Sequence, residues 1–109
     1  MLFRSPEFSK LNKEQQHKLF TTFSISDDNN RVGYRLKESL ENNLSSILTS
    51  AVLPGTVQLT PSGKCIILMQ DCQVTGGYPR ILQLSEIAIA RVSQKITGDK
   101  IQFLLEDHL

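Results

Sequence analysis

The sequence is poor in the residues that build metal centres and disulfide frameworks. Among its 109 residues there are two cysteines, two histidines and no tryptophan. It contains no Cys-x-x-Cys, no histidine pair at helical spacing and no His-Glu-x-x-His, so the sequence predicts no metal site. Cys65 and Cys72 lie seven positions apart, and without a secretory signal we expect reduced thiols rather than a disulfide.

Long hydrophobic runs and a strong excess of one charge are also missing. The longest uninterrupted apolar run is Cys65–Met69, whereas a membrane-spanning helix needs about 20 residues. The first residues lack the hydrophobic region of a signal peptide. Lys and Arg total 12 against 11 Asp and Glu, and a net charge of +1 gives no general field to attract nucleic acid or an anionic membrane. We therefore expect a cytoplasmic protein whose partners include neither nucleic acid nor a membrane.

The length of the chain fits one domain, which we assign to residues 1–109. A polar segment with spaced apolar residues predicts one amphipathic helix at about residues 9–21, capped by Ser9 or Asn12. Ser85 begins a second short helix with an acidic residue in its first turn. Both predicted helices are short beside the extended segments that fill the rest of the chain.

Short extended segments at about residues 22–106 alternate with turn signals every eight to twelve positions. The pattern predicts a mainly-β fold, with an antiparallel sheet closed or nearly closed into a barrel and two short helices. Strands are predicted at Thr21–Ser26, Val32–Leu36, Ser46–Ser50, Thr56–Thr60, Cys65–Gln70, Arg80–Leu84 and Ile101–Leu105. Turns or loops are predicted at Asp27–Asn30, Lys37–Asn43, Leu53–Thr56, Pro61–Lys64 and Gly98–Asp99.

The segment from residue 71 to residue 78 carries polar side chains around a glycine pair, directly after a buried strand. Gly76 and Gly77 allow backbone N–H groups to approach a ligand. Asp71 is a hydrogen-bond acceptor or base, and Gln73 offers a donor and an acceptor that suit an amide or urea-like group. The alternative is that the glycine pair forms a bulge or turn, with Asp71 and Gln73 satisfying its backbone.

A second candidate segment contains two arginines. Arg31 and Arg35 alternate with apolar residues, and a strand would place both on related faces. A guanidinium there is suited to a carboxylate or carbonate. The alternative is a solvated strand edge. Gln58, in the middle of a predicted strand, points either to a pocket or to solvent.

Three blocks in order resemble one family: Asn30–Leu36, Leu53–Ile81 and Gln94–Phe103. They are similar to the C-terminal part of the allophanate-hydrolase-subunit-2 family. That family includes the carboxyltransferase region of urea carboxylase, the C subunit of bacterial 5-oxoprolinase, and antagonists of a histidine-kinase inhibitor. The chain departs from the family pattern at Val32 and Thr97, where Met and Pro are usual, and family members are considerably longer.

The resemblance implies a cyclophilin-like antiparallel β-barrel and identifies the chain as the C-terminal part of a longer family member. It implies a small amide substrate and a subunit-B-type, cyclophilin-like partner protein, joined by a subunit-A-type protein in the 5-oxoprolinase members. We expect this domain to bind no cofactor itself, with ATP or biotin serving the full complex.

We expect this chain to be the C-terminal domain of one subunit of a multi-component amide-processing enzyme. The C subunit of 5-oxoprolinase is the first choice. We expect this chain to be inactive alone. Two alternatives stay open: a regulatory module that antagonises a histidine-kinase inhibitor, and the carboxyltransferase region of a biotin-dependent urea carboxylase. In the expected site Arg31 holds an anionic group and Asp71 orients a neighbour or accepts a proton, as the catalytic pair. The substrate-binding residues are Gln58, Gln73, Thr75, Gly76, Gly77 and Tyr78.

Overall fold

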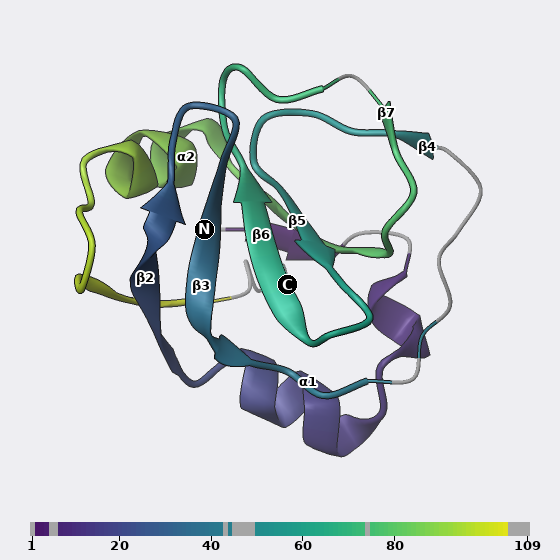
Figure 1. Ribbon diagram of the computed structural model, residues 1–109. Coiled ribbons are helices and arrows are strands. Elements are labelled where there is room, and N and C mark those ends of the chain that lie inside the picture. Colours follow the sequence, from purple (N-terminus) through teal and green to yellow (C-terminus); the bar gives the residue numbers. More distant parts are fainter. Residues whose placement is uncertain (1, 5–6, 43, 45–49, 74, 105–109) are drawn as a thin grey trace.

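The computed structural model describes residues 2–4, 7–42, 44, 50–73 and 75–104 (Figure 1). In chain order its elements are β1 (Leu2–Arg4), the 3-10 helix η1 (Phe8–Lys10), α1 (Lys13–Leu19), β2 (Thr22–Asn29), β3 (Gly33–Ser39), β4 (Ser50–Ala51), β5 (Thr56–Leu59), β6 (Lys64–Leu68), β7 (Thr75–Gly76), β8 (Arg80–Leu84), α2 (Glu86–Ser93) and β9 (Lys100–Gln102).

Seven strands form one sheet in the order β1-β8-β5-β6-β3-β2-β9, and every pairing in it is antiparallel. The sheet curls into a half-barrel, with α1 across its lower end in Figure 1. β4 and β7 pair separately as a two-stranded antiparallel ribbon, here called the β4–β7 ribbon. The prediction of a mainly-β, antiparallel fold with two short α-helices is confirmed.

The main core lies inside the curl of the sheet. Alternate residues of β5 and β6, such as Val57, Leu59 and Ile67, point into it and are fully buried. Both helices contribute, α1 through Leu19 and α2 through Ile89. Each large aliphatic side chain buried in this way stabilises the fold by about 1.5–3 kcal/mol. The central hairpin of β5 and β6 is therefore a rigid base for what lies on its other face.

The residues between these core positions face the opposite side of the sheet. Ile66 and Leu68 of β6 form a second apolar cluster with Val52. Gln58 of β5 lies opposite Ile66 in the strand register. A Cβ added at Gly76 of β7 would meet both Gln58 and Val52, so the β4–β7 ribbon covers this face of the hairpin.

The first predicted helix is interrupted. Residues 8–10 form η1, and α1 begins only after Asn12, which has extended backbone angles. The Asn12 side chain accepts from the Gln15 backbone N–H, and the Gln15 side chain accepts from Asn12 in return, a capping box that fixes the start of α1. Asn12 is thus the cap rather than Ser9. No helix in the described part of the chain is long and apolar enough to cross a membrane.

The predicted turn at Asp27–Asn30 is wrong, because β2 continues to Asn29. The chain reverses at residues 30–32, where Asn30 Oδ1 accepts from the backbone N–H groups of Val32 (2.8 Å) and Gly33 (3.1 Å). An Asn side chain that satisfies the backbone two residues ahead is a turn device in its own right. The acidic pair preceding it, Asp27 and Asp28, belongs to β2 and is exposed.

The predicted loop at Lys37–Asn43 is also wrong in its first part, since Lys37 to Ser39 continue β3 and Ser39 pairs with Lys64 of β6. Their polarity reflects solvent exposure of the strand rather than a loop. Of the predicted strand at Ser46–Ser50, only Ser50 lies among the described residues. The last predicted strand is observed as β9, but it ends at Gln102, so Phe103 and Leu104 lie after the strand, and residue 105 lies outside the described residues.

The turn at Leu53–Thr56 and the helix cap at Ser85 are confirmed. The Thr56 backbone N–H donates to Leu53 O at 3.0 Å, and Gly55 has a φ of +93°. Ser85 Oγ accepts from the Ala88 backbone N–H at 3.2 Å.

Both cysteines are free thiols. Cys65 is fully buried in the core, and desolvation raises the pKa of its thiol to about 12. Cys72 is half-buried beside the second apolar cluster, and burial raises the pKa of its thiol as well. Neither thiol is therefore poised as a nucleophile at neutral pH.

Candidate functional site

The fold brings Arg31 and Asp71 together from positions 40 residues apart. Arg31 Nε donates to Asp71 Oδ2 at 2.7 Å, and the Asp71 backbone N–H donates to Arg31 O at 2.9 Å. The hydrogen bond and charge of Asp71 raise the pKa of the Arg31 guanidinium, which stays charged. The two side chains are 80% and 52% exposed, so the pair adds little to stability and stays open to a ligand.

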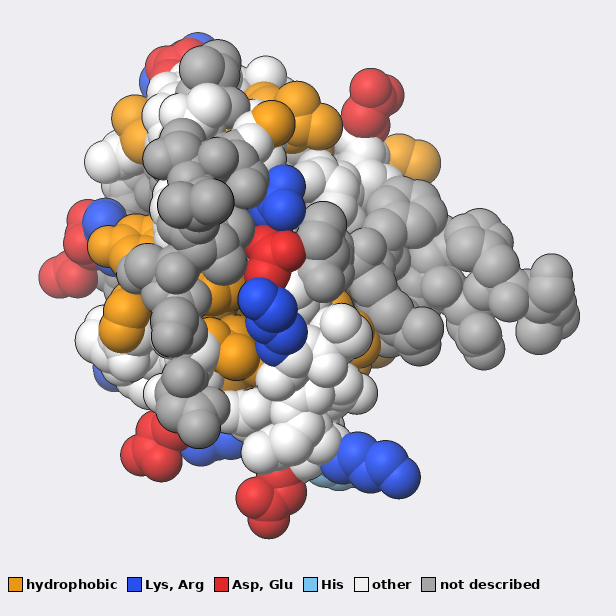
Figure 2. Space-filling model, turned by 90° about the vertical axis from the view of Figure 1, so that its right-hand side faces the viewer, with side chains coloured by type: hydrophobic (Ala, Val, Ile, Leu, Met, Phe, Trp, Pro, Cys, Tyr) orange, Lys and Arg blue, Asp and Glu red, His pale blue; other side chains and the backbone are white. Residues whose placement is uncertain are grey.

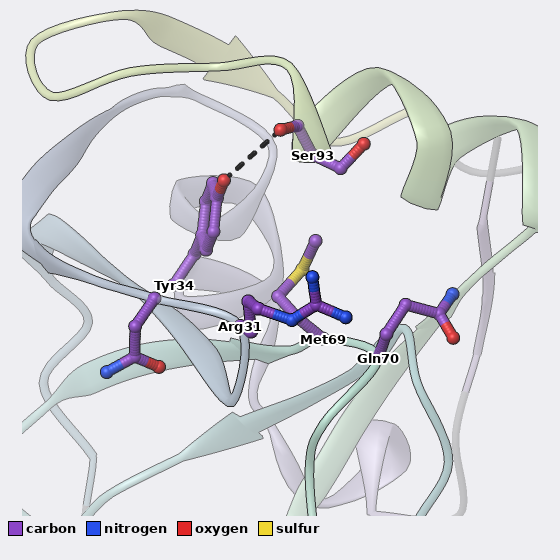
Figure 3. Close-up of a pocket in the computed structure, with 6 residues that line it drawn as sticks. Arg31, Tyr34, Met69, Gln70 and Ser93 are labelled. Atoms are coloured by element: carbon purple, nitrogen blue, oxygen red, sulfur yellow. Dashed lines mark hydrogen bonds between the residues drawn. The ribbon is translucent and has the colours of Figure 1, made fainter.

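A pocket of about 310 Å³ opens beside Arg31 (Figure 3). Tyr34 of β3 and Ser93 at the end of α2 form one wall, where Tyr34 Oη donates to Ser93 O at 3.3 Å. In Figure 3 the Arg31 guanidinium extends toward Gln70, and Met69 lies beside it. The pocket combines a cationic group with an aromatic face and a thioether, a lining suited to a small anion with an apolar body.

A second group of predicted residues, Gln58, Gln73 and Gly76, meets at the β4–β7 ribbon. Gln58 is 2% exposed on β5, and its Nε2 has no hydrogen-bond partner among the described residues. A Cβ built at Gly76 would lie 2.5 Å from Gln58 Nε2 and 3.6 Å from Gln73 Nε2. A side chain at position 76 would crowd this buried carboxamide, and glycine allows the close approach. The sequence predicted all three residues for the site but not their contact.

The remaining predicted residues lie near the ribbon. Thr75 is exposed and pairs with Ala51 in the ribbon, Gly77 is half-buried and Tyr78 is exposed. Gly76 lies in a strand rather than a turn, and the carboxylate of Asp71 binds Arg31. A direct role in ligand binding for Thr75, Gly77 and Tyr78 stays a prediction.

The two arginines of the second candidate segment have separate surroundings. Arg31 lies in the β2–β3 turn, whereas Arg35 lies on β3 and binds Asp28 at 3.1 Å. The expectation that one strand face carries both arginines is therefore wrong. Arg35 and Asp28 are both well exposed, like Arg31 and Asp71, but Arg35 does not line the pocket. This similarity makes Arg35 a matched control for Arg31.

The sequence did not predict the ion pair between Glu7 and Arg80, which connects the β4–β7 ribbon to the main sheet. Glu7 Oε1 accepts from Arg80 Nε and from the Arg80 backbone N–H, each at 2.9 Å, and Arg80 Nη1 donates to Ala51 O of β4 at 3.2 Å. Figure 2 shows the face that carries the ribbon, with basic and acidic side chains side by side near its middle and hydrophobic side chains next to them. Glu7 and Arg80 are 73 positions apart, and no local motif marks either.

Burial by itself raises the pKa of the Glu7 carboxyl, but the hydrogen bonds and charge of Arg80 outweigh it and leave the pKa below its usual value.

Tyr34 and Ser93 line the pocket, but the sequence did not predict them as pocket residues. Tyr34 lies within the arginine-containing segment that the sequence had marked, whereas Ser93 at a helix end carries no signal of its own.

Comparisons with known proteins agree on one relationship. The family described as carboxyltransferase domain, subdomain A and B, matches residues 1–105. The C subunit of 5-oxoprolinase from Escherichia coli is 33% identical over 102 residues, and that from Haemophilus influenzae is 33% identical over 107. Each match covers 91% of this chain and 33% of the relative, so the chain spans about a third of the length of these curated relatives. A crystal structure of Kluyveromyces lactis urea carboxylase shares the fold, with a TM-score of 0.86 and 20% identity over 97% of this chain and 10% of that one.

Proposed function

The chain belongs to the carboxyltransferase-domain family, subdomains A and B, and we propose that it is the C-terminal domain of the C subunit of a 5-oxoprolinase. In this proposal the whole enzyme opens the lactam ring of 5-oxoproline with ATP. The observation that carries it is the exposed Arg31–Asp71 pair at the edge of a pocket large enough for such a ring. Pockets for small molecules begin at roughly 300 Å³.

Arg31 is the group that binds the substrate carboxylate. Its contact with Asp71 uses Nε, and a guanidinium carries further N–H donors in a planar fork that matches a carboxylate. A carboxylate arriving at Arg31 competes with Asp71 for the guanidinium. Asp71 is then an acceptor placed beside the bound ligand, suited to the ring N–H or to a proton released from it. Met69 and Tyr34 supply apolar surface for the ring.

The remaining chemistry belongs to partner proteins in this proposal. Subunit-B-type and subunit-A-type proteins complete the enzyme, ATP is bound by the complex rather than by this domain, and the domain alone is inactive. Two supports are the identity with the C subunit of 5-oxoprolinase and the one-third share of the relatives' length that the chain spans.

Transfer of a carboxyl group to urea is the second candidate. It is favoured by the family itself, which is named for a carboxyltransferase domain. An arginine at a pocket edge suits carbonate as well as carboxylate. The two candidates differ in substrate, since one predicts turnover of 5-oxoproline with ATP and the other predicts turnover of urea with a biotin-carrying partner.

Replacing Arg31 by alanine in the full-length protein that carries this chain is expected to lower 5-oxoproline turnover by the complete complex about 10- to 100-fold, because a charge-assisted contact to the substrate is lost. Asp71→Asn, which keeps the shape and removes the charge, is expected to lower turnover as well. The measurement is 5-oxoproline-dependent phosphate release with the subunit-A-type and subunit-B-type partners present.

Arg35→Ala is the matched control, because it removes another exposed arginine that also binds an aspartate. It is expected to leave turnover within about twofold of the unaltered protein, since rim charges away from a site have small effects. Unchanged turnover in both Arg31→Ala and Asp71→Asn would exclude the pair from the site.

A further inference from the structure

Gln58 is an unusual residue for the middle of a buried strand. Its neighbours along β5, Val57 and Leu59, are fully buried core residues. The Gln58 side chain faces the other side of the sheet, is nearly inaccessible, and leaves Nε2 without an acceptor among the described residues. A buried donor without a partner destabilises a fold, so a residue of this kind indicates a ligand contact when its surroundings have room to change.

The surroundings of Gln58 are those of a small binding site. Gly76 lies so close to Nε2 that a Cβ there would be 2.5 Å from it, and it supplies no side-chain acceptor. Gln73, an exposed residue, holds its carboxamide nitrogen 3.6 Å from the same Cβ position, so two N–H donors lie near Gly76. Ile66 and Val52 supply adjacent apolar surface. A few convergent polar groups in an apolar setting are typical of sites for small molecules.

The cover over Gln58 is a short, separate ribbon. The β4–β7 ribbon consists of two residues from each strand and pairs with no other strand among the described residues. A side-chain hydrogen bond from Arg80 Nη1 to Ala51 O links it to the main sheet. Because no other strand of the described residues pairs with the ribbon, an outward movement of Gly76 exposes the Gln58 donor without breaking the main sheet.

We propose that Gln58 and Gln73 bind the carbonyl oxygen of a small neutral amide, a lactam or a urea, which enters beneath the β4–β7 ribbon and takes the place of Gly76 against Gln58 Nε2. The choice of ligand class rests on the proposed function, whereas the site itself rests on the buried donor and the glycine above it. In this arrangement the carbonyl oxygen satisfies Gln58, and the apolar residues Ile66 and Val52 contact the body of the ligand.

The test uses the 109-residue chain, with 2-pyrrolidone and urea as separate probes followed by NMR of the glutamine side-chain NH₂ groups. The NH₂ resonances of Gln58 and Gln73 are expected to shift in a saturable manner with at least one probe, while those of Gln83 stay in place. Gln58→Leu is expected to weaken probe binding at least tenfold and to raise the midpoint of thermal unfolding, because it removes an unsatisfied buried donor.

Gln83→Leu is the matched control. Gln83 is a glutamine of the neighbouring strand β8 whose carboxamide is satisfied, since its Oε1 accepts from Thr56 Oγ1 at 2.8 Å and its Nε2 donates to Pro54 O at 2.9 Å. Its replacement is expected to keep probe binding and to lower the unfolding midpoint. The unfolding midpoint is expected to rise in Gln58→Leu and to fall in Gln83→Leu. These opposite shifts distinguish a ligand-binding glutamine from a structural one.

The proposal is overturned if neither probe shifts the Gln58 resonances, if Gln58→Leu binds the probes as tightly as the unaltered chain, or if it lowers the midpoint as Gln83→Leu does. The proposed function fails separately. Saturable binding of a probe together with absent 5-oxoproline turnover in the complete complex removes 5-oxoproline as the substrate and leaves the carbonyl site standing. Binding of urea alone supports the same site and points to the carboxyltransfer candidate.

Discussion

Replacing Arg80 by leucine is expected to lower the free energy of unfolding by about 3 kcal/mol, because it leaves the Glu7 carboxylate buried without its partner. The Arg80 and Glu7 side chains are 21% and 9% exposed, so water screens the pair only in part. The variant also removes the donor to Ala51 O, which frees the β4–β7 ribbon. Urea denaturation of the chain and the variant measures the difference.

Two further variants show whether the loss of stability comes from the unpaired Glu7 carboxylate. Arg35→Leu removes an exposed ion pair and is expected to lower the free energy of unfolding by less than about 1 kcal/mol. Adding Glu7→Gln to Arg80→Leu is expected to recover part of the loss, since a neutral amide is less costly to bury than a carboxylate. A loss for Arg80→Leu no larger than that for Arg35→Leu contradicts a structural role for the Glu7–Arg80 pair.

The same pair predicts a pH dependence. In the folded chain the pKa of Glu7 lies below its usual value of 4.5, so folding favours the ionised carboxyl. Its contribution to stability is therefore complete above that usual value and is lost as the pH falls through the lower pKa of the folded state. The difference in free energy of unfolding between the chain and Glu7→Gln is expected to shrink over that acidic range. A difference that stays constant from neutral pH to below that range contradicts the assignment.

Gly55→Ala is expected to lower the free energy of unfolding by about 3 kcal/mol, through backbone strain and overpacking together. Gly55 has a φ of +93°, and a Cβ there would lie 2.7 Å from Ile89 Cδ1 and 2.8 Å from Gln83 Nε2. The backbone strain of an L-residue in this region contributes roughly 1–2 kcal/mol, and the crowding against Ile89 contributes the rest.

Gly98→Ala separates the two contributions. Gly98 has a φ of +91°, but a Cβ there would meet nothing within 4 Å. It should therefore show the backbone strain alone, about 1–2 kcal/mol, in the same urea denaturation experiment. Equal losses at the two glycines would mean that Ile89 and Gln83 yield to the added methyl group without cost, contrary to the packing of α2 against this turn.

Sequence reasoning reached the elements whose signals are local. Pro54 and Gly55 specify their turn through fixed and positive φ angles, Ser85 caps its helix, and alternating apolar residues mark the central hairpin. It failed where a polar segment turned out to be an exposed strand, as at Asp27–Asn29, because charge reports exposure rather than backbone geometry. The β4–β7 ribbon, with two residues in each strand, is too short for any periodicity to reveal.

The sequence suggested candidate site residues one by one, but not how they are arranged. Arg31 and Asp71 were chosen for their chemistry, and only the fold shows that the β2–β3 turn places Arg31 beside Asp71. Gln58 was left between pocket and solvent, whereas it is buried under Gly76 with its donor unsatisfied. Contacts of this kind join segments far apart in the sequence, and one sequence contains no signal for which distant residues meet.

5-Oxoproline-dependent ATP hydrolysis by the full-length protein that carries this chain, combined with its subunit-A-type and subunit-B-type partners, tests the proposed function most directly. We predict phosphate release that requires all the components, does not occur with urea in place of 5-oxoproline, and falls about 10- to 100-fold with Arg31→Ala but not with Arg35→Ala. Phosphate release that continues unchanged when the protein is omitted would contradict the proposal.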